Sequence, residues 1–191
     1  MKKLQQLLTG TIGLTGQQFN RFSDELKCRS LKKKEHLIRE GSTCDFIGIV
    51  TGGTLRSYVQ NEEHEFNNDF YFADHFISAY TSFLTRSPTN CNIEALTDSQ
   101  ILYLTRDQLD RLIANDPGFL HLAKYISDLF FIRKCKRETS FLKNNAGERF
   151  RILCDNFPGI EQQVSQYHIA SYLGIKPESL SRLKSLTYIN R

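Results

Sequence analysis

Hydrophobic residues recur along the chain with two different spacings, and the change between them separates its regions. In residues 15–26 the apolar side chains follow a three- and four-residue spacing behind Thr15, which predicts a short helix capped by that threonine. From residue 28 to about residue 105, short runs rich in β-branched and aromatic residues predict strands instead. The expected strands are residues 36–39, 46–51, 54–60, 65–72, 91–96 and 99–105.

Turn residues separate these expected strands. Gly52-Gly53 stands between two of the runs and predicts a tight hairpin, because glycine adopts positive φ without a steric penalty. Glu40-Gly41-Ser42 and Asn61-Glu62-Glu63 mark two further turns. Many short antiparallel strands of this kind are typical of a sandwich or a small barrel, such as a double-sheet jelly roll.

Helical spacing returns after the last expected strand. Residues 106–115 predict a short helix, and a long helix is expected over residues 117–144, with Asp116 as its N-cap and Pro117 at its first position. A further helix is expected over residues 146–156. The chain therefore predicts an α+β protein in which strands come first and helices follow.

The long helix carries more apolar residues than one face needs. One stripe is expected to cover the sheet, while a second stripe with near-heptad spacing is expected to stay exposed on a monomer and to mediate self-association. This second stripe consists of Phe119, Leu122, Ile126, Leu129 and Arg133. The basic residues of the second half of the helix are expected to be mostly solvated: Arg133, Lys134, Lys136, Arg137 and Lys143. The alternative is that both stripes are buried within one chain.

The stretch SQYHIASYLGIKPESLSRLK, residues 165–184, predicts two short helices joined by a tight turn. Ser165 is placed to cap a first helix over residues 166–173, and Pro177 begins the second. Ala170, Gly174 and Leu180 have the spacing of a helix-turn-helix, in which they provide a close helix approach, a left-handed turn and an apolar plug.

The second of these helices presents a small polar face formed by Glu178, Ser179, Ser181, Arg182 and Ser185. One interpretation is a helical hairpin that only packs, with Glu178 and Arg182 as an i, i+4 ion pair. The other is a helix that reads DNA. Charge favours the second interpretation, because residues 133–191 contain 11 Lys and Arg against 5 Asp and Glu, whereas residues 1–132 contain 14 against 16.

Composition excludes several other classes of protein. The longest apolar runs are too short to span a membrane, and the first residues make a poor signal peptide. The 5 cysteines are scattered without a C-x-x-C pair, which favours free thiols in the cytoplasm over a disulfide framework or a cysteine-bound metal. No His-x-His pair, Gly-rich phosphate loop or nucleophile motif occurs, so neither a cupin-type enzyme nor another enzyme is favoured.

Three segments in order resemble the Crp/Fnr family of bacterial transcription regulators. These are KKKEHLIREGSTCDFIGIVTGGTLRSYV, SFLTRSPTNCNIEALTDSQILYLTRDQLDRL and HIASYLGIKPESLSRLK. The resemblance implies a cyclic-nucleotide-binding-like β-roll over residues 1–115, a dimerisation helix over residues 116–144 and a winged-helix-like DNA-binding domain over residues 145–191. The double-stranded β-helix or jelly roll expected from the strand pattern agrees with this organisation.

The resemblance also implies roles for individual residues. Glu178 and Arg182 match the glutamate and arginine that reach base edges in this family, with Ser179 and Ser181 on the same surface. The positions expected to grip DNA phosphates are Ser165, Gln166, Lys176 and Lys184. The implied partners are double-stranded DNA with a pseudo-palindromic site, a second copy of the chain, and RNA polymerase as a further candidate.

The chain departs from the family members that bind cyclic AMP. They hold the ribose with a glutamate and the cyclic phosphate with an arginine, but the corresponding stretches here, residues 76–80 and 88–91, contain neither. We therefore expect no cyclic AMP binding in that mode and no cofactor, and the effector is unknown. Arg86 is a weak substitute for the missing arginine. The expected occupants of the pocket are the apolar side chains of Phe72, Phe76, Ile77, Tyr80 and Phe83.

Some alternatives remain open. Cys28 and Cys44 are too few and too far apart for an iron–sulfur cluster, but haem sensing through a histidine is left open, with candidates His36, His64, His75 and His121. A sensor or scaffold that keeps the fold without reading DNA is the main rival function. Residues 186–191 leave room for one strand of a wing after the second helix.

Overall fold

The computed structural model of the chain describes the backbone of residues 2–189 and the side chains up to Ser185. Its strands form two four-stranded antiparallel sheets, in the orders β1-β8-β3-β6 and β2-β7-β4-β5. The strands are β1 Lys27–Leu31, β2 His36–Ile38, β3 Phe46–Gly52, β4 Leu55–Gln60, β5 Glu65–Tyr71, β6 Phe76–Ile77, β7 Asn92–Ala95 and β8 Ser99–Thr105. The double-sheet roll that the strand pattern predicted is confirmed.

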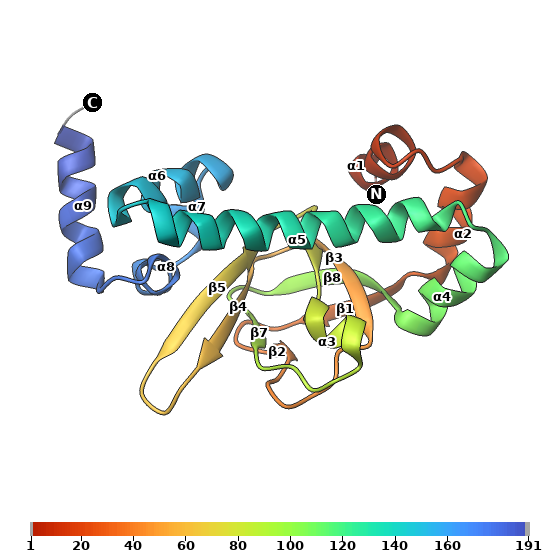
Figure 1. Cartoon of the computed structure of the whole chain (residues 1–191), viewed down its shortest axis with the longest axis horizontal. Helices are drawn as coiled ribbons and strands as arrows, with labels where there is room; N and C mark the ends of the chain where they lie inside the picture. Colours follow the sequence, from red (N-terminus) through yellow and green to blue (C-terminus); the bar gives the residue numbers. More distant parts are fainter. Residues whose placement is uncertain (1, 190–191) are drawn as a thin grey trace.

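Helices come before, between and after these strands along the chain. They are α1 Lys2–Gln6, the π-helical turn η1 Leu7–Thr11, α2 Gly16–Glu25, α3 Tyr80–Thr85, α4 Arg106–Asn115, α5 Phe119–Lys143, α6 Ala146–Asn156, α7 Ile160–Gln163, α8 Gln166–Leu173 and α9 Pro177–Ile189. The 25 residues of α5 make a rod of about 37 Å, which runs from the N-terminal helices past the roll to the C-terminal helices (Figure 1). No helix within residues 2–189 is both long and apolar enough to cross a membrane.

Apolar side chains from the inner faces of both sheets fill the space between them. Leu55, Ile77, Ile93, Ala95 and Ile101 are fully buried there. Since successive residues of a strand point to opposite faces, the neighbours of these residues point outward and create two outer faces that also need cover. The two outer faces decide where the helices pack.

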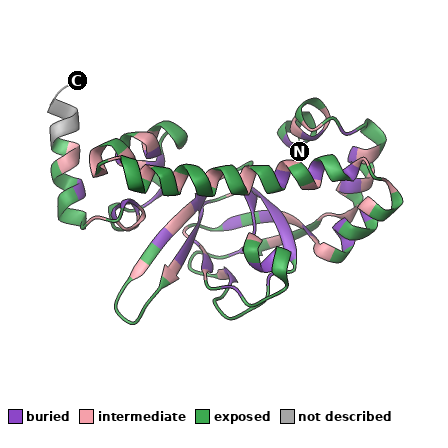
Figure 2. Cartoon of the chain, in the orientation of Figure 1, coloured by how far each residue is buried: buried purple, intermediate pink, exposed green. Residues whose placement is uncertain are grey.

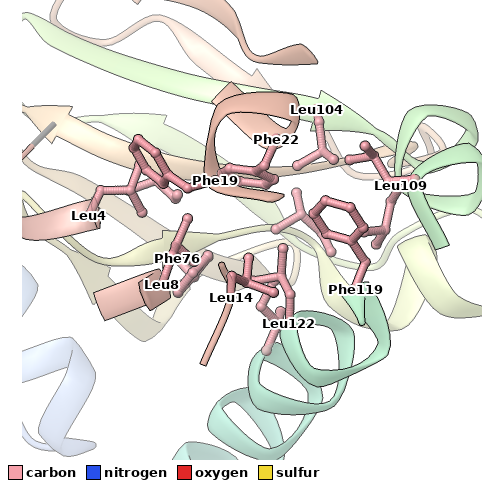
Figure 3. Close-up of a cluster of buried hydrophobic side chains, with 14 of the residues drawn as sticks. Leu4, Leu8, Leu14, Phe19, Phe22, Phe76, Leu104, Leu109, Phe119 and Leu122 are labelled. Atoms are coloured by element: carbon pink, nitrogen blue, oxygen red, sulfur yellow. The ribbon is translucent and has the colours of Figure 1, made fainter. Parts of the chain in front are cut away.

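The outer face of the β1-β8-β3-β6 sheet is covered by the N-terminal helices, α4 and the first half of α5. Phe119, Leu122 and Ile126 of α5 are at most 1% exposed in this cluster. Phe119 and Leu122 point toward Phe76 and the side chains of α2 (Figure 3). Burial of apolar surface contributes about 25 cal/mol per Å², so this cluster stabilises the packing of α5 on the sheet.

This packing overturns the expected role of the near-heptad stripe. Phe119, Leu122 and Ile126 are buried against the roll of their own chain, and Leu129 packs at the edge of the same cluster. Arg133, the last residue of the stripe, pairs with Asp69 of β5. The stripe was predicted to face a partner because it has coiled-coil spacing, but a helix lying on a sheet uses the same spacing.

A different face of α5 is left open. The exposed large apolar side chains of α5 are Leu120, Phe131, Ile132, Phe141 and Leu142, and three of them, Leu120, Phe131 and Leu142, share one sector of the helix. We call this sector of Leu120, Phe131 and Leu142 the exposed strip, and Figure 2 shows exposed residues along the whole length of α5. Any self-association through α5 must therefore use this strip and not the predicted stripe.

The outer face of the β2-β7-β4-β5 sheet is covered by the C-terminal helices. Phe70 of β5 is fully buried among side chains of α6, α7, α8 and α9, including Phe150, Leu153, Ile169 and Leu180. The C-terminal helices therefore pack against the roll and are not joined to it by the connecting chain alone.

Three local expectations need correction. Gly52 and Gly53 do not close a hairpin, because β3 and β4 belong to different sheets and the two glycines carry the chain between them. A Cβ on Gly53, where φ is +83°, would lie 2.5 Å from the carbonyl oxygen of Asp98, so this crossing requires glycine. Helix α5 begins at Phe119 and not at Pro117, because residues 117–118 form a turn with i→i+3 hydrogen bonds, while the Asp116 side chain accepts the Gly118 amide as the predicted cap does.

The end of the chain also differs from expectation. Helix α9 continues to Ile189, so residues 186–189 extend the second helix instead of beginning a strand. Residues 190–191 of the predicted wing strand lie outside the described residues.

Candidate nucleic-acid interface

Helices α8 and α9 form the predicted helix-turn-helix. Ser165 caps α8 by accepting the amide of His168, and Gly174 ends it in a left-handed conformation at φ +67°. Ala170 and Leu180 are fully buried between the helices. The spacing of alanine, glycine and leucine in the sequence therefore predicted the local structure correctly.

Gly174 is the tightest point of this unit. A Cβ at this position would lie 3.1 Å from Cε1 of Phe141, in a backbone conformation that costs an L-residue about 1–2 kcal/mol. We expect Gly174→Ala to lower the free energy of unfolding by about that amount in a urea titration. Gly16→Ala, at a position with negative φ and no atom within 4 Å, is the matched control and should change stability by less than about 1 kcal/mol. Equal effects of the two substitutions would contradict this account of the turn.

The polar face of α9 is open to solvent. Glu178, Ser179, Ser181 and Arg182 are all exposed, and they lie at the end of the molecule farthest from the N-terminal helices (Figure 1). Among the side chains that the structure describes, no ion pair involves Glu178 or Arg182. The i, i+4 pair of the packing-only interpretation is therefore not formed.

The residues predicted to grip phosphate fall into two groups. Ser165, Gln166 and Lys176 are exposed near the turn and the start of α8. Lys184 instead forms an ion pair with Glu161 of α7, and its side chain is only 18% exposed. Lys184 thus contributes to packing between α7 and α9, and its predicted phosphate contact would require it to leave this partner.

Polar contacts fix α8 against β5. The backbone amide of Asn67 donates to Oγ of Ser171 (2.9 Å), and this hydroxyl donates to the carbonyl of Glu65 (2.8 Å). These bonds satisfy two backbone groups of β5, the edge strand of its sheet, and so hold α8 at a defined place along β5. No residue pattern in the sequence indicates these contacts, and they were not predicted.

Arg137 joins three elements of the fold. Its Nη2 donates to the carbonyls of Asn67 (3.0 Å) and Tyr172 (3.1 Å), so α5, β5 and α8 meet at one guanidinium. Its Cζ lies over the rings of Phe141 and Tyr172, 4.5 and 4.7 Å from their centroids. Arg149 follows the same pattern, because it stacks on Phe141 and donates to the carbonyl of Leu173.

The expectation that the basic half of α5 is mostly solvated is therefore wrong for Arg133 and Arg137. Arg133 pairs with Asp69, and burial of that carboxyl raises its pKa although the charge of Arg133 acts in the opposite direction. The sequence signal for the burial of Arg137 was Phe141, four positions further along the helix, together with Tyr172 on α8. Helical spacing alone does not show which arginine these rings cover.

Around residues 76–80, the stretch compared above with the nucleotide-binding segment of the family, the side chains of Cys44, Ser78 and Ser82 are buried. Cys44 donates its amide to Oγ of Ser82 (2.9 Å), and Ser78 donates to the carbonyl of Phe46 (2.9 Å). Burial raises the pKa of the Cys44 thiol, so this thiol stays protonated and neutral. Arg86 points outward, where it is 66% exposed and 3.8 Å from Asp110 of α4.

Only one of the predicted occupants lies inside the roll. Ile77 belongs to the interior cluster, whereas Phe76 and Phe83 face the helices on the outer side of the sheet. Tyr80 stacks on Phe130 of α5, with ring centroids 4.6 Å apart. Phe72 packs with Phe157 beside the C-terminal helices.

The histidines do not assemble into a site. His36 lies on β2, His64 in the β4–β5 turn, His75 after β5 and His121 on α5. Burial lowers the pKa of His75 to about 4, so it is neutral near pH 7. Within residues 2–189 no group of three or more metal-ligating side chains is positioned to hold a metal ion.

Residues 28–116 match the family model of the cyclic nucleotide-binding domain. This range covers nearly all of the roll and α4, and it confirms the cyclic-nucleotide-binding-like fold expected for the first half of the chain. No protein of curated function matches the sequence.

Solved structures, two of them of regulators, share the fold of nearly the whole chain. FixK2 from Bradyrhizobium japonicum superposes with a TM-score of 0.75 at 17% identity, covering 86% of this chain and 85% of its own. The c-di-GMP-responsive global regulator CLP of Xanthomonas campestris gives 0.71 at 12% identity, with 92% and 93% covered. A protein of the Crp/Fnr family from Eubacterium rectale gives 0.70 at 18% identity, with 96% and 87% covered. The chain therefore has the fold of the Crp/Fnr regulators.

Proposed function

We propose that this chain, with its Crp/Fnr fold, is a sequence-specific DNA-binding transcription regulator that acts as a homodimer and is not controlled by cyclic AMP. The observation that carries the proposal is the uncovered polar face of α9 on a correctly built helix-turn-helix. A regulator is favoured over an enzyme, since the structural neighbours include a global regulator and a transcriptional regulator of the Crp/Fnr family.

DNA reading accounts for the chemistry of the exposed face better than a scaffold does. Arg182 presents a planar guanidinium that suits the O6 and N7 acceptors of guanine, and Glu178 can accept from cytosine N4. A packing helix would bury these side chains or pair them, and the structure shows neither for the described contacts. Lys176, Ser165 and Gln166 flank this face, where phosphates would lie.

The homodimer is proposed to form through the exposed strip of α5. Leu120 is 54%, Phe131 69% and Leu142 84% exposed, which is unusual for large apolar side chains. At about 100° per residue these three lie within one narrow sector of the helix, along the full length of the rod. A second α5 packed on this strip would bury them and bring two copies of α9 to one side of the dimer.

Independence from cyclic AMP rests on what fills the roll. The interior holds Leu55, Ile77, Ile93 and Ile101 at 0% exposure, and no cation among the described residues points into it. A cyclic phosphate in this space would lack the compensating charge that burial of an anion requires.

The test is specific DNA binding by Arg182→Ala. A site is first selected from random duplexes with the full chain, and the variant is then expected to lose about 10- to 100-fold in affinity and to relax the choice of one base pair. Lys176→Ala should weaken specific and random duplexes alike and reduce the salt dependence by about one charge.

Arg86→Ala is the control for loss of an exposed arginine outside the interface, and it should bind as the unmodified chain does. Added cyclic AMP should leave all affinities unchanged. If Arg182→Ala kept the full preference for the selected site, α9 would not be the reading helix. If selection returned no preferred sequence, the chain would be a scaffold of the same fold.

A further inference from the structure

A charged network crosses the boundary between the roll and the helix-turn-helix. The side chain of Arg56, on β4, is only 5% exposed, and its Nη1 donates to Oε2 of Glu65 (2.6 Å) while its Nη2 donates to Oε2 of Glu94 (2.6 Å). Its guanidinium lies 3.9 Å from the ring centroid of Tyr58 on the same strand. Two carboxylates and a ring thus hold this cation in one position on the outer face of the sheet.

One residue of α8 completes the network. Nδ1 of His168 lies 3.3 Å from Nη1 of Arg56 and 3.4 Å from Nδ2 of Asn67. Asn67 also donates from Nδ2 to the carbonyl of His168 (3.2 Å). Asn67 and Arg56 are 1% and 4% exposed, so both of these donors are buried where α8 meets the sheet.

The chemistry of these partners determines the protonation of His168. A guanidinium and an amide NH₂ group can only donate, so Nδ1 must carry a lone pair and any ring proton must be on Nε2. A proton on Nδ1 would remove both hydrogen bonds and place a second positive charge beside Arg56.

The other charged or titratable groups around the ring come from each neighbouring element. They are Glu65 on β5, Glu94 on β7 and Tyr167 on α8 itself, whose ring lies 5.5 Å from that of His168. The two glutamates favour a proton on His168, but both already accept from Arg56.

We infer that His168 is a proton-sensitive contact that docks the helix-turn-helix on the roll, so that its protonation releases α8 from β5 and weakens specific DNA binding. When α8 is docked on β5, the polar face of α9 stays uncovered and is held at a defined place and angle relative to the roll. If α8 and α9 were released from the roll, they would have to be ordered again when they bind DNA, and this ordering costs conformational entropy. The consequence for DNA rests on the proposed function, whereas the docking contact itself does not.

The electrostatic surroundings agree with this direction. Burial first and the charge of Arg56 second lower the pKa of His168 from its ordinary value, while Glu65 and Glu94 act in the opposite direction. A base with a lowered pKa binds its proton more tightly in the released form. The contribution to docking is therefore complete above the ordinary histidine pKa of about 6.5 and is lost as the pH falls through the window below it.

The experiment measures docking and DNA binding separately on the full chain at pH 7.5 and pH 5.5. Docking is followed by hydrogen exchange of residues 65–71 and 166–173, corrected for the intrinsic effect of pH, with β3 and β8 as the internal reference. DNA binding is measured with a selected site and with a random duplex. Between pH 7.5 and pH 5.5 the unmodified chain is expected to lose protection in both segments and about tenfold in affinity for the selected site.

Three variants make the assignment specific. His168→Gln keeps an acceptor oxygen and cannot titrate, so both losses should disappear. His168→Lys carries a permanent charge and should show the released behaviour at both pH values. His121→Gln removes an exposed histidine of α5 and should keep the full pH dependence of the unmodified chain.

The outcomes separate the two proposals. If His168→Gln kept the pH dependence of exchange, or if His168→Lys stayed docked at pH 7.5, the inference about this contact would be overturned. If exchange responded as expected but no duplex was preferred at any pH, the docking contact would stand and the proposed DNA-binding function would fail.

Discussion

Phe131→Glu is expected to give a folded monomer, whereas Phe119→Ala is expected to destabilise the fold strongly. Phe131 is 69% exposed on the strip of α5 that faces away from the roll, so a charge there disrupts association without disturbing the core. Phe119 is 0% exposed between α5 and the sheet, and its truncation should cost about 3–5 kcal/mol of unfolding free energy. The two residues lie on the same helix and differ only in the direction they point.

Sedimentation at low micromolar concentration and urea unfolding of both variants measure this difference. Lys134→Glu, an exposed change on the same helix, controls for the added charge and should leave both the mass and the stability near those of the unmodified chain. A dimeric Phe131→Glu together with a folded, monomeric Phe119→Ala would restore the near-heptad stripe as the dimer contact and would contradict the packing described above.

Arg56→Ala is expected to produce the second large effect, a loss of about 3–5 kcal/mol of unfolding free energy. The substitution leaves Glu65 and Glu94 facing each other without their shared cation, and breaking a buried pair costs far more than the pair itself contributes. Burial by itself would lower the pKa of Arg56, but hydrogen bonds and charges from the two glutamates outweigh it and raise that pKa. The guanidinium is therefore charged at every pH at which the chain is folded.

Two variants calibrate this loss in the same urea titration. Lys32→Ala breaks a pair with Asp98 in which the two side chains are 85% and 65% exposed, and it should cost less than about 1 kcal/mol. Arg56→Lys keeps the charge but cannot bond to both carboxylates in the same plane, so an intermediate loss is expected. If Arg56→Ala were no more destabilising than Lys32→Ala, the network would not support the docking of α8.

Much of the local structure could be predicted from residue patterns. The capping of α2 by Thr15, the paired strands β4 and β5 on either side of residues 61–64, and the glycine turn at Gly174 each depend on neighbours within about four residues. The buried positions of Ala170 and Leu180 followed from the same short spacing. Such features are local because capping and turn chemistry are satisfied within one element.

The candidate interface was predictable for a similar reason. The polar positions of α9 follow from helical periodicity once Leu180 is placed inside, so the exposure of Glu178 and Arg182 needed no tertiary information. Lys184 lies only two positions beyond Arg182, yet its ion pair with Glu161 depends on where α7 folds back against α9.

The sequence by itself thus determined the elements, their order and the polar face of α9. Only the tertiary structure decided which stripe of α5 is buried, that Gly52 and Gly53 join two sheets, and that Arg56, Asn67 and His168 meet. The physical reason is that periodicity states which residues share a face but not which surface covers that face. That choice is made by burial of the whole chain at once, when the outer face of each sheet takes the helices that fit it.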